Sequence, residues 1–392
     1  MKTIFKCFFF SIIFIVYSKV VFAQTNKLTS LVSLFDGRYY GGNPVSPPPL
    51  AYKSVWLSLS RSKNVLDYQS LSYGLDALSA MYAATGNLKY INDELVLINN
   101  VVNSAVPLQK IKDNKSRFKD NYSTWVVRDT SKENKDLNMN ETILSEIYFF
   151  QYVSSLLVTI KNDDVLFSKY RDFYNRTLQF TENEIWDKWY RRRLELGMRN
   201  ALYMDGRTHT ECHWAFIATD LYQLTKDSRR KVECSSVFSA YNTLLANNFS
   251  VNPKMPDVQI WNSTWDVAPR HVNIIQDVSH GNLVVSYIVH SYDMNLFWKK
   301  STIDNLIRLL SKYLWNGSSF TFWDNLDGSK ELQTSSRGTF QSDGWVKLGR
   351  YSRSVQNIYE QYIKFGTVGH AKDPQLYANM ALNEKILSSK GL

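Results

Sequence analysis

Residues 66–103 read LDYQSLSYGLDALSAMYAATGNLKYINDELVLINNVVN, and the fold class follows from the pattern in this stretch. Apolar residues recur at helical spacing from Leu66 to Ala84 and again from Tyr90 to Asn103. The short polar sequence Thr85-Gly86-Asn87 separates the two segments. The pattern predicts two antiparallel amphipathic helices joined by a tight turn.

The same pattern occurs about five times along the chain. The later helix pairs lie at residues 142–159 and 166–189, 211–224 and 230–246, 279–290 and 303–315, and 355–363 and 374–387. Such units bury their apolar faces by stacking on one another. The repeat predicts an all-α protein.

The connections between these pairs differ from the turns within them. Turns within pairs are a few residues long, whereas the connections between pairs span residues 104–139, 190–208, 248–276 and 316–352. Antiparallel helix pairs form a bundle, an open solenoid or a closed ring. Long loops in a compact domain usually carry function, and a ring brings all of them to one rim. This asymmetry favours an α/α toroid, an incomplete or six-hairpin ring, with that rim as the working face.

The N-terminus has the three-part layout of a secretory signal peptide. Two lysines accompany an apolar run over residues 7–17, and Val21-Phe22-Ala23 offers a cleavage site. The run is shorter than the roughly 20 residues that cross a bilayer, so a membrane anchor is the weaker alternative. No other window reads as a membrane span. We expect a signal peptide over residues 1–23, an N-terminal extension over 24–54, a toroid domain over 55–392, and a secreted or periplasmic mature protein without an integral membrane segment.

The net charge and the cysteines limit the kinds of partner and bond that we expect. The formal net charge is +10, and three lysines of the signal segment contribute to it. This mild basic bias suits an acidic polymer, although lysine-rich outer helices explain it equally well. No dense basic stripe extends beyond Arg191-Arg192-Arg193 and Arg229-Arg230-Lys231, which argues against nucleic acid. Cys212 and Cys234 either form a disulfide or remain two buried thiols.

No cofactor motif stands out in the chain. Cys212 has no CxxC partner, which argues against a zinc site. A phosphate loop, a dinucleotide fingerprint, a serine elbow and a calcium loop are all missing from the sequence. We therefore expect neither a metal nor an organic cofactor.

Histidines gather where two helix pairs begin. One group, His209 and His213, lies in THTECHW, residues 208–214; the other runs from Arg270-His271 to DVSHGN, residues 277–282. In a ring the first helices of successive pairs are parallel, so their N-terminal ends meet at one rim. We therefore expect His213 and His280 to face one cleft.

These segments also hold helix-capping residues. Thr208 with Glu211 reads as a capping box, and Asp277 or Ser279 is a good N-cap. A helix N-terminus disfavours imidazolium, so His280 can stay neutral there and accept a proton. Gly281 would let a ligand approach the backbone closely. The alternative is that Asp277 and His280 only cap the helix and that Gly281 only packs.

The long loops are rich in tryptophan. Exposed indole faces suit the apolar face of a sugar ring, and the alternative is that they plug the loops onto the core. These residues are Trp125, Trp261, Trp265, Trp323 and Trp345. Further rim positions are Tyr68, Gln69, Asn140, Glu141, Glu146, Tyr351 and Arg353, and Tyr287 lies two turns below His280 on the same helix face.

Three segments carry a resemblance to a known superfamily. They are the turn regions at residues 82–87 and 221–227 and the helix start DVSHGN at residues 277–282. With the hairpin repeat, they make most of residues 55–390 resemble the carbohydrate-active α/α-toroid superfamily. That group includes six-hairpin glycosidases, toroid polysaccharide lyases such as alginate lyases, and the helical domain of glucuronyl epimerases. The Asn-Asn-His type of segment of toroid alginate lyases is not found in this sequence.

The first functional hypothesis is a polysaccharide lyase acting on a uronate-containing polymer. β-Elimination needs a neutral base, a proton donor and a group that blunts the carboxylate charge. The base is His280 or His213, and the donor is Tyr287 or Tyr351. The neutralising group is Asn282, Arg270 or Arg353, and His209, His271, Trp261, Trp265 and Trp345 complete the substrate-binding set.

Two alternatives stay open. A glycoside hydrolase needs two carboxyl groups about 5–10 Å apart, and the candidates are Glu211, Asp277, Asp266 and Glu141. A non-catalytic polysaccharide-binding protein would use the toroid only as a scaffold. In each case the expected partner is a polysaccharide or an oligosaccharide.

Overall fold

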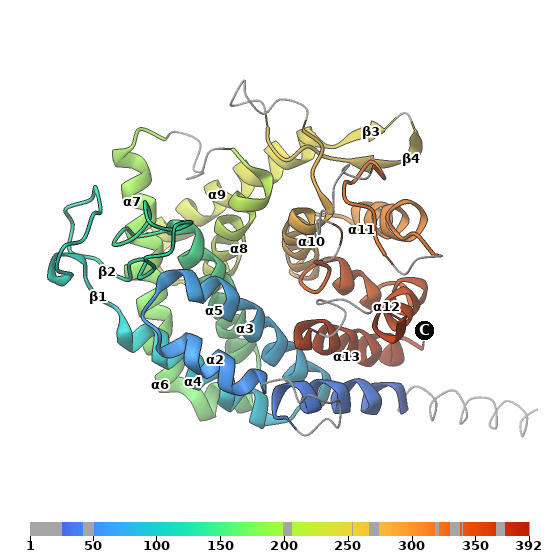
Figure 1. Cartoon of the computed structure of the whole chain (residues 1–392), viewed down its shortest axis with the longest axis horizontal. Helices are drawn as coiled ribbons and strands as arrows, with labels where there is room; N and C mark the ends of the chain where they lie inside the picture. The colour runs from blue at the N-terminus through green and yellow to red at the C-terminus, as the bar shows by residue number, and fades with distance from the viewer. Residues whose placement is uncertain are drawn as a thin grey trace, which may run out of the picture.

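A computed structural model describes residues 26–41, 51–198, 206–252, 254–265, 274–317, 321–329, 338, 340–365 and 373–391. The predicted signal peptide, together with Arg270, His271 and Asp266, lies outside these residues. Within them the chain forms a closed ring of helices, which Figure 1 shows down its axis. The fold class is therefore all-α, an α/α toroid, as the sequence predicts.

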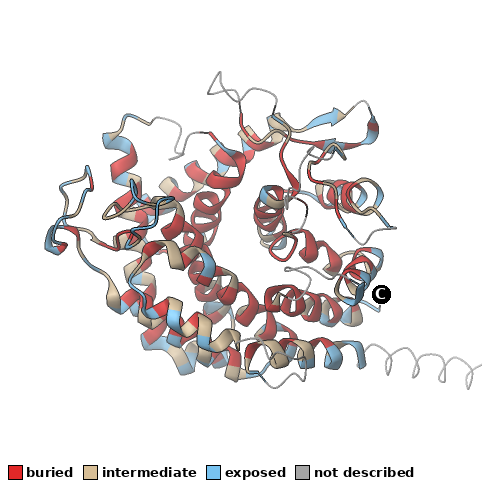
Figure 2. Cartoon of the chain, in the orientation of Figure 1, coloured by how far each residue is buried: buried red, intermediate tan, exposed pale blue. Residues whose placement is uncertain are grey.

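The inner layer of the ring consists of six segments. They are α3 (Val65–Thr85), α5 (Ile143–Asn162), α8 (Thr208–Leu224), α10 (Val278–Asp293), η4 (Trp345–Arg350) and α13 (Pro374–Ser389). Each packs on the next, and α13 packs on α3 to close the ring. Figure 2 shows that these segments are mostly buried, which fits their nearly continuous apolar sequences.

The outer layer runs antiparallel to the inner one. It consists of α4 (Leu88–Ser104), α6 (Asp164–Phe180) with η2 (Thr181–Trp186) and α7 (Asp187–Glu195), α9 (Ser228–Asn248), α11 (Lys300–Arg308) with η3 (Leu309–Leu314), and α12 (Arg353–Phe365). One side of each of these helices is buried, and the other side faces solvent (Figure 2). The fifth hairpin therefore pairs η4 with α12, whereas the sequence pairs 355–363 with 374–387.

The last outer position belongs to the helix over residues 26–39. On one side, Asp36 accepts hydrogen bonds from Lys89 and Tyr90 of α4, both at 2.8 Å. On the other side, Lys27 pairs with Glu360 of α12 at 2.8 Å. This helix and α2 (Tyr52–Arg61), which packs on α3 and α4, place part of the segment before residue 55 in the helical layers.

Helix ends follow from local capping chemistry. The Asn64 side chain accepts a hydrogen bond from the N–H of Leu66 at the start of α3. Gly86 ends that helix with φ +70, a left-handed conformation that glycine adopts without strain. Asn87 then caps α4. The predicted turn at Thr85-Gly86-Asn87 is therefore confirmed.

The long connections hold the strands. β1 (Val106–Pro107) pairs antiparallel with β2 (Ser123–Thr124), with η1 (Leu108–Lys110) between them, and β3 (Ser250–Asn252) pairs with β4 (Met255–Ile260). Isolated bridges join Arg207 to Thr264 and Asp277 to Asn325. The long connections thus meet next to the N-terminal ends of α8 and α10.

The structure bears on two further sequence expectations. α5 is long and apolar enough to span a membrane by composition, but 72% of its most apolar window is buried inside the ring. The expectation that no other window reads as a membrane span therefore does not hold by composition, whereas the burial of α5 is that of a core helix. Cys212 and Cys234 are buried free thiols, which is one of the two alternatives above.

Gly344 lies directly against the backbone of α10. A Cβ at this position would lie 1.9 Å from the carbonyl oxygen of Asn282 and 2.5 Å from the backbone nitrogen of Ser286 in α10. We expect Gly344→Ala to lower the free energy of unfolding by about 1–3 kcal/mol because the backbones must separate. Gly281→Ala is the control, since its Cβ would meet only side chains at 3.5 Å or more. Urea unfolding of both variants tests this, and equal stability of the two would contradict it.

Candidate functional site

The N-terminal ends of α8 and α10 lie side by side at one rim. Thr208 donates a hydrogen bond to Gln276 Oε1 at 2.8 Å, and Gln276 Nε2 donates to Asp277 Oδ2 at 3.1 Å. Asp277 Oδ2 is also 2.8 Å from His280 Nδ1. The rings of His209 and His280 are 4.3 Å apart. This chain of contacts forms the rim cluster, defined as His209, Gln276, Asp277 and His280.

The two imidazoles of the rim cluster differ in exposure and in charge. The His280 side chain is 51% exposed, whereas His209 is buried. Burial, followed by the charge of His280, lowers the pKa of His209 to about 3, so this ring is neutral. Burial opposes ionisation of Asp277, but the hydrogen bond from His280 prevails and lowers its pKa. The cluster thus holds an accessible imidazole oriented by a carboxylate.

His213 does not share this exposure. It lies one turn below His209, is fully buried, and its Nδ1 is 2.8 Å from Gln151 Oε1. Its ring centroid is 3.6 Å from that of Tyr148. Burial lowers the pKa of His213 well below its usual value. The imidazole that meets His280 is therefore His209, and the expected cleft between His213 and His280 is wrong.

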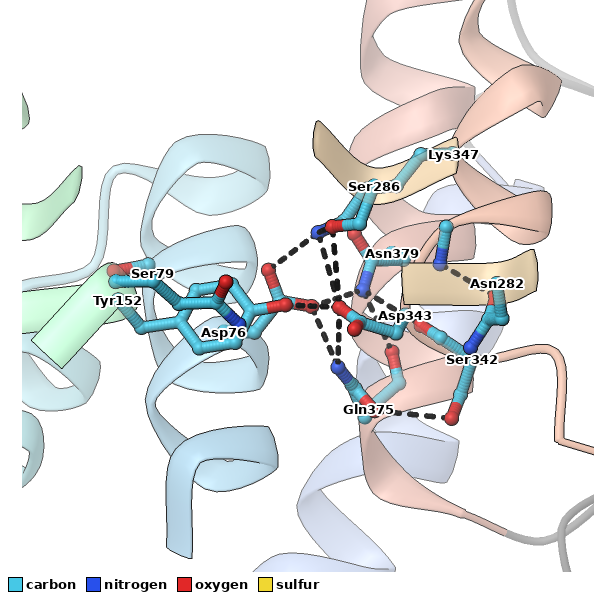
Figure 3. A network of polar contacts seen from close by, with 12 residues as sticks. Asp76, Ser79, Tyr152, Asn282, Ser286, Ser342, Asp343, Lys347, Gln375 and Asn379 are labelled. Atoms are coloured by element: carbon cyan, nitrogen blue, oxygen red, sulfur yellow. Dashed lines mark hydrogen bonds and ion pairs between the residues drawn. The ribbon is translucent and has the colours of Figure 1, made fainter. Parts of the chain in front are cut away.

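Deeper on the ring axis lies a second polar cluster, which Figure 3 shows. Asp76 of α3 accepts hydrogen bonds from Lys347 at 2.8 Å, from Gln375 at 2.8 Å and from Asn379 at 2.8 Å. Asp343 lies 3.6 Å from the same Lys347 ammonium. We call Asp76, Asp343, Lys347, Gln375 and Asn379 the axial cluster; it joins α3, the segment before η4, η4 and α13.

The two carboxyl groups of the axial cluster lie close together in unequal environments. Gln375 Nε2 is 2.8 Å from Asp76 Oδ2 and 3.5 Å from Asp343 Oδ1. Tyr152 and Ser286 donate further hydrogen bonds to Asp343 Oδ1. Burial raises the pKa of Asp343 to about 6, Lys347 opposes this shift, and Asp76 adds to it.

Asp343 also keeps one free atom. Its Oδ2 is buried and has no hydrogen-bond partner within the described part of the chain. A carboxyl group with a raised pKa beside a second carboxyl group has the composition of an acid and base pair.

A cavity of about 220 Å³ adjoins the axial cluster on the side of the C-terminal helix ends. Asp76 and Lys347 stand on its wall, while Asp343 lies directly behind them. The complete lining is Asp76, Ser79, Ala80, Ala83, Tyr152, Ser155, Thr159, Phe216, Ser286, Val289, His290, Asp293, Lys347, Arg350, Asn379 and Leu382. The cavity therefore opens at the pole opposite to the rim cluster.

Several predicted site residues have structural partners instead. The Asn282 side chain accepts hydrogen bonds from Gly344 N at 2.7 Å and Trp345 N at 2.9 Å. Tyr287 is buried and donates to Asn242 at 2.9 Å. Glu211 is fully buried, and Arg353 pairs with Glu384. Of the remaining rim positions, Tyr351 bonds to Asp293, Tyr68 to Ser104, and Glu141 and Glu146 to Arg192 and Lys188.

Four of the five tryptophans of the long loops are buried in the core, and Trp323 is partly exposed. Trp261 and Trp345 are fully buried, and Trp125 and Trp265 are nearly so. The Trp345 indole donates to Val278 O at 2.9 Å. These four residues plug the loops onto the core, which was the alternative to sugar stacking. A Cβ at Gly281 would also meet packed side chains, including that of Trp261 at 3.5 Å. Gly281 is thus a packing residue.

The sequence analysis missed the axial cluster. Asp76 lies inside the apolar run LDALSAM of α3, and Asp343 precedes Gly344-Trp345. An acidic residue within a run that must be buried is the signal that could have found them, because a buried carboxyl group needs partners. Among the described residues no group of three or more His, Cys, Asp or Glu side chains is placed to hold a metal ion.

Comparisons with known proteins complete the description. No family model matches the chain, and no curated protein matches it. Among solved structures, the chain is similar to an inactive variant of the α-1,6-mannanase GH76A of Salegentibacter sp. HEL1_6 in complex with α-1,6-mannotriose. The identity is 11%, the match covers 93% of this chain and 99% of that one, and the TM-score is 0.45.

A second similar structure is a point mutant of Rex8A from Paenibacillus barcinonensis, complexed with 3(3)-α-L-arabinofuranosyl-xylotetraose. The identity is 11%, the match covers 94% of this chain and 92% of that one, and the TM-score is 0.49. Identities of this size assign no residue role to this chain.

Proposed function

We propose that this chain is a carbohydrate-active enzyme that hydrolyses a glycosidic bond at the axial cluster. The single observation that supports this proposal is the pair Asp76 and Asp343, two carboxyl groups held by one ammonium group with the pKa of Asp343 raised to about 6. Glycoside hydrolysis needs one carboxylic acid that is still protonated near neutral pH and one carboxylate.

The roles follow from the two environments. Asp343 lies directly behind the cavity wall with Oδ2 buried, so the bound substrate must displace the side chains between them before Asp343 protonates the glycosidic oxygen and the bond to the leaving sugar breaks. Asp76, on the cavity wall, attacks the anomeric carbon and forms a glycosyl ester. Water then attacks this ester while Asp343 accepts the proton of the water, which regenerates both groups. The shared contacts with Lys347 and Gln375 indicate the short carboxyl spacing of a retaining enzyme.

The first prediction is the stereochemical outcome. We expect the enzyme to release reducing sugar with retention of the anomeric configuration and without an unsaturated, ultraviolet-absorbing product. The test incubates the protein with a panel of neutral and acidic oligosaccharides and follows the first product by proton NMR. Inversion would contradict the nucleophilic role of Asp76, and no release of reducing sugar from any member would count against hydrolysis itself.

One observation favours a second candidate function, β-elimination at the rim cluster. His280 is half exposed, and Asp277 orients its ring as for a general base. In the same assay, an unsaturated product that disappears in His280→Ala but persists in Asp343→Asn would favour elimination. Hydrolysis has the better support because both predicted donors, Tyr287 and Tyr351, are engaged in other contacts. Of the predicted neutralising groups, Asn282 and Arg353 also have other partners, and Arg270 lies outside the described residues.

We also propose that the chain is exported with its first 23 residues as a signal peptide, because an enzyme for polymeric glycans must meet them outside the cell. Expression in a secreting host, followed by mass spectrometry of the mature N-terminus, tests this. Cleavage after Ala23 is the expected result, and retention of the intact N-terminus inside the cell would contradict it.

A further inference from the structure

The cavity beside the axial cluster runs from an exposed mouth to a buried base. Ala83 and Asp293 at the C-terminal ends of α3 and α10 are exposed. Tyr152 and Asn379 at the opposite end are buried, with Asn379 only 1% exposed. The volume of about 220 Å³ is below the roughly 300–1,000 Å³ of pockets that hold drug-sized ligands. The space therefore suits a single small polar unit.

The charges on the cavity wall are already paired. Lys347 pairs with Asp76 at 2.8 Å, Arg350 with Asp293 at 3.2 Å, and His290 with Asp220 at 2.7 Å. Each of the three basic side chains in the lining therefore has an acidic partner. A ligand with a carboxylate would compete with these partners, and displacing Asp76 or Asp220 costs free energy because both carboxyl groups are buried. The wall therefore favours a ligand without net charge.

One buried acceptor on this wall is unused. Asn379 donates its Nδ2 hydrogens to Asp76 Oδ2 at 2.8 Å and to Ser342 O at 3.2 Å. Its Oδ1 is buried and has no hydrogen-bond partner among the residues that the structure describes. A buried acceptor without a partner costs about 1–3 kcal/mol, so a hydroxyl group that donates to it would bind favourably.

The lining of the cavity also includes apolar side chains. Phe216, Val289 and Leu382 line it together with two alanines. A ring with hydroxyl groups on its edge and C–H groups on its faces matches a cavity whose lining contains both polar and apolar side chains. A pyranose sugar has this form.

From these features we infer that the cavity is a binding site for one neutral sugar unit, which enters at the pole of the C-terminal helix ends. The inference rests on the proposed function, since it names the substrate class and the entry side of that site. It also narrows the expectation that the substrate is an acidic polymer. An uncharged terminal sugar unit fits a wall whose charged side chains already have partners, whereas a uronate does not.

The experiment measures binding without turnover. Isothermal titration calorimetry of the full chain with glucose, mannose, galactose, xylose and glucuronate provides the probes. We expect at least one neutral sugar to bind and glucuronate not to bind. Ala83→Trp should abolish that binding because the indole blocks the mouth, while Ser236→Trp, at an exposed position of the outer helix α9, should leave it unchanged.

The outcomes separate the two proposals. Neutral-sugar binding that Ala83→Trp abolishes supports the inference even if no substrate is ever hydrolysed, in which case only the proposed function fails. Tighter binding of glucuronate, no binding of any neutral sugar, or binding that survives in Ala83→Trp overturns the inference even when hydrolysis is observed.

Discussion

Asp343→Asn is expected to lower kcat/KM for glycoside hydrolysis by about 10²- to 10⁴-fold, the contribution of a positioned general acid. Asparagine keeps the shape of the side chain, and Tyr152 and Ser286 can still donate to its oxygen. It cannot deliver a proton, so only the chemical step is lost. Initial rates on the best member of the oligosaccharide panel measure the effect, and circular dichroism verifies the fold.

The pH dependence of the hydrolysis rate provides a second test of the role of Asp343. Asp343 must be protonated to act as the acid, and its pKa is raised to about 6. Activity of the unmodified enzyme should therefore be present below pH 6 and decline as the pH rises through about 6. Asp304→Asn on the exposed face of α11 is the control and should keep both rate and profile. A wild-type rate in Asp343→Asn would remove Asp343 from the mechanism.

The same shift links pH to stability. A carboxyl group whose pKa is raised on folding, here from 3.8 to about 6, binds its proton more tightly in the folded protein. Its contribution to stability is complete below pH 3.8 and is lost as the pH rises through about 6. Asp343→Asn should remove this pH-dependent term, so the variant should resist unfolding at pH 7 at least as well as the parent.

The helix pairs could be predicted from the sequence wherever local chemistry sets them. The turn at residues 85–87 carries its own signals, a left-handed glycine and an asparagine cap, and these need no knowledge of the rest of the chain. The fifth hairpin lacked such signals because its inner member, η4, is six residues of 3-10 helix without helical periodicity. The sequence analysis placed the helix over residues 26–39 in an N-terminal extension outside the toroid domain for a related reason. Its partners Lys89 and Glu360 are distant in sequence.

The candidate site could likewise be predicted only where local chemistry determines it. The rim cluster could be predicted in part because Asp277 and His280 belong to one helix N-terminus, where capping rules apply. His209 rather than His213 faces His280 because the helix rotation that decides this depends on packing, which capping residues do not specify. The axial cluster joins Asp76 with residues near the other end of the chain, and only ring closure brings them together.

Lys188→Met is expected to have the largest effect on stability, a loss of about 3–5 kcal/mol in the free energy of unfolding. Lys188 of α7 and Glu146 of α5 are both 0% exposed, and their charged atoms are 2.7 Å apart. Lys188 also donates to Ser123 O at 3.1 Å in β2, so it ties the first long connection to both helical layers. Burial raises the pKa of Glu146 despite the opposing charge of Lys188. Without the lysine, the lone carboxyl group must stay buried or take up a proton.

Urea unfolding of four variants, Lys188→Met, Glu146→Gln, their double variant and Lys300→Met, separates this cause from simple loss of packing. Lys300→Met breaks an exposed pair with Asp304 and should cost less than about 1 kcal/mol. Adding Glu146→Gln to Lys188→Met removes the unpaired charge, and the double variant should recover much of the loss, because a buried charge without a partner costs more than a missing pair. If the double variant is as unstable as the sum of the two single variants, the lysine acts through its packing, and the ion pair is not what holds the first connection against the ring.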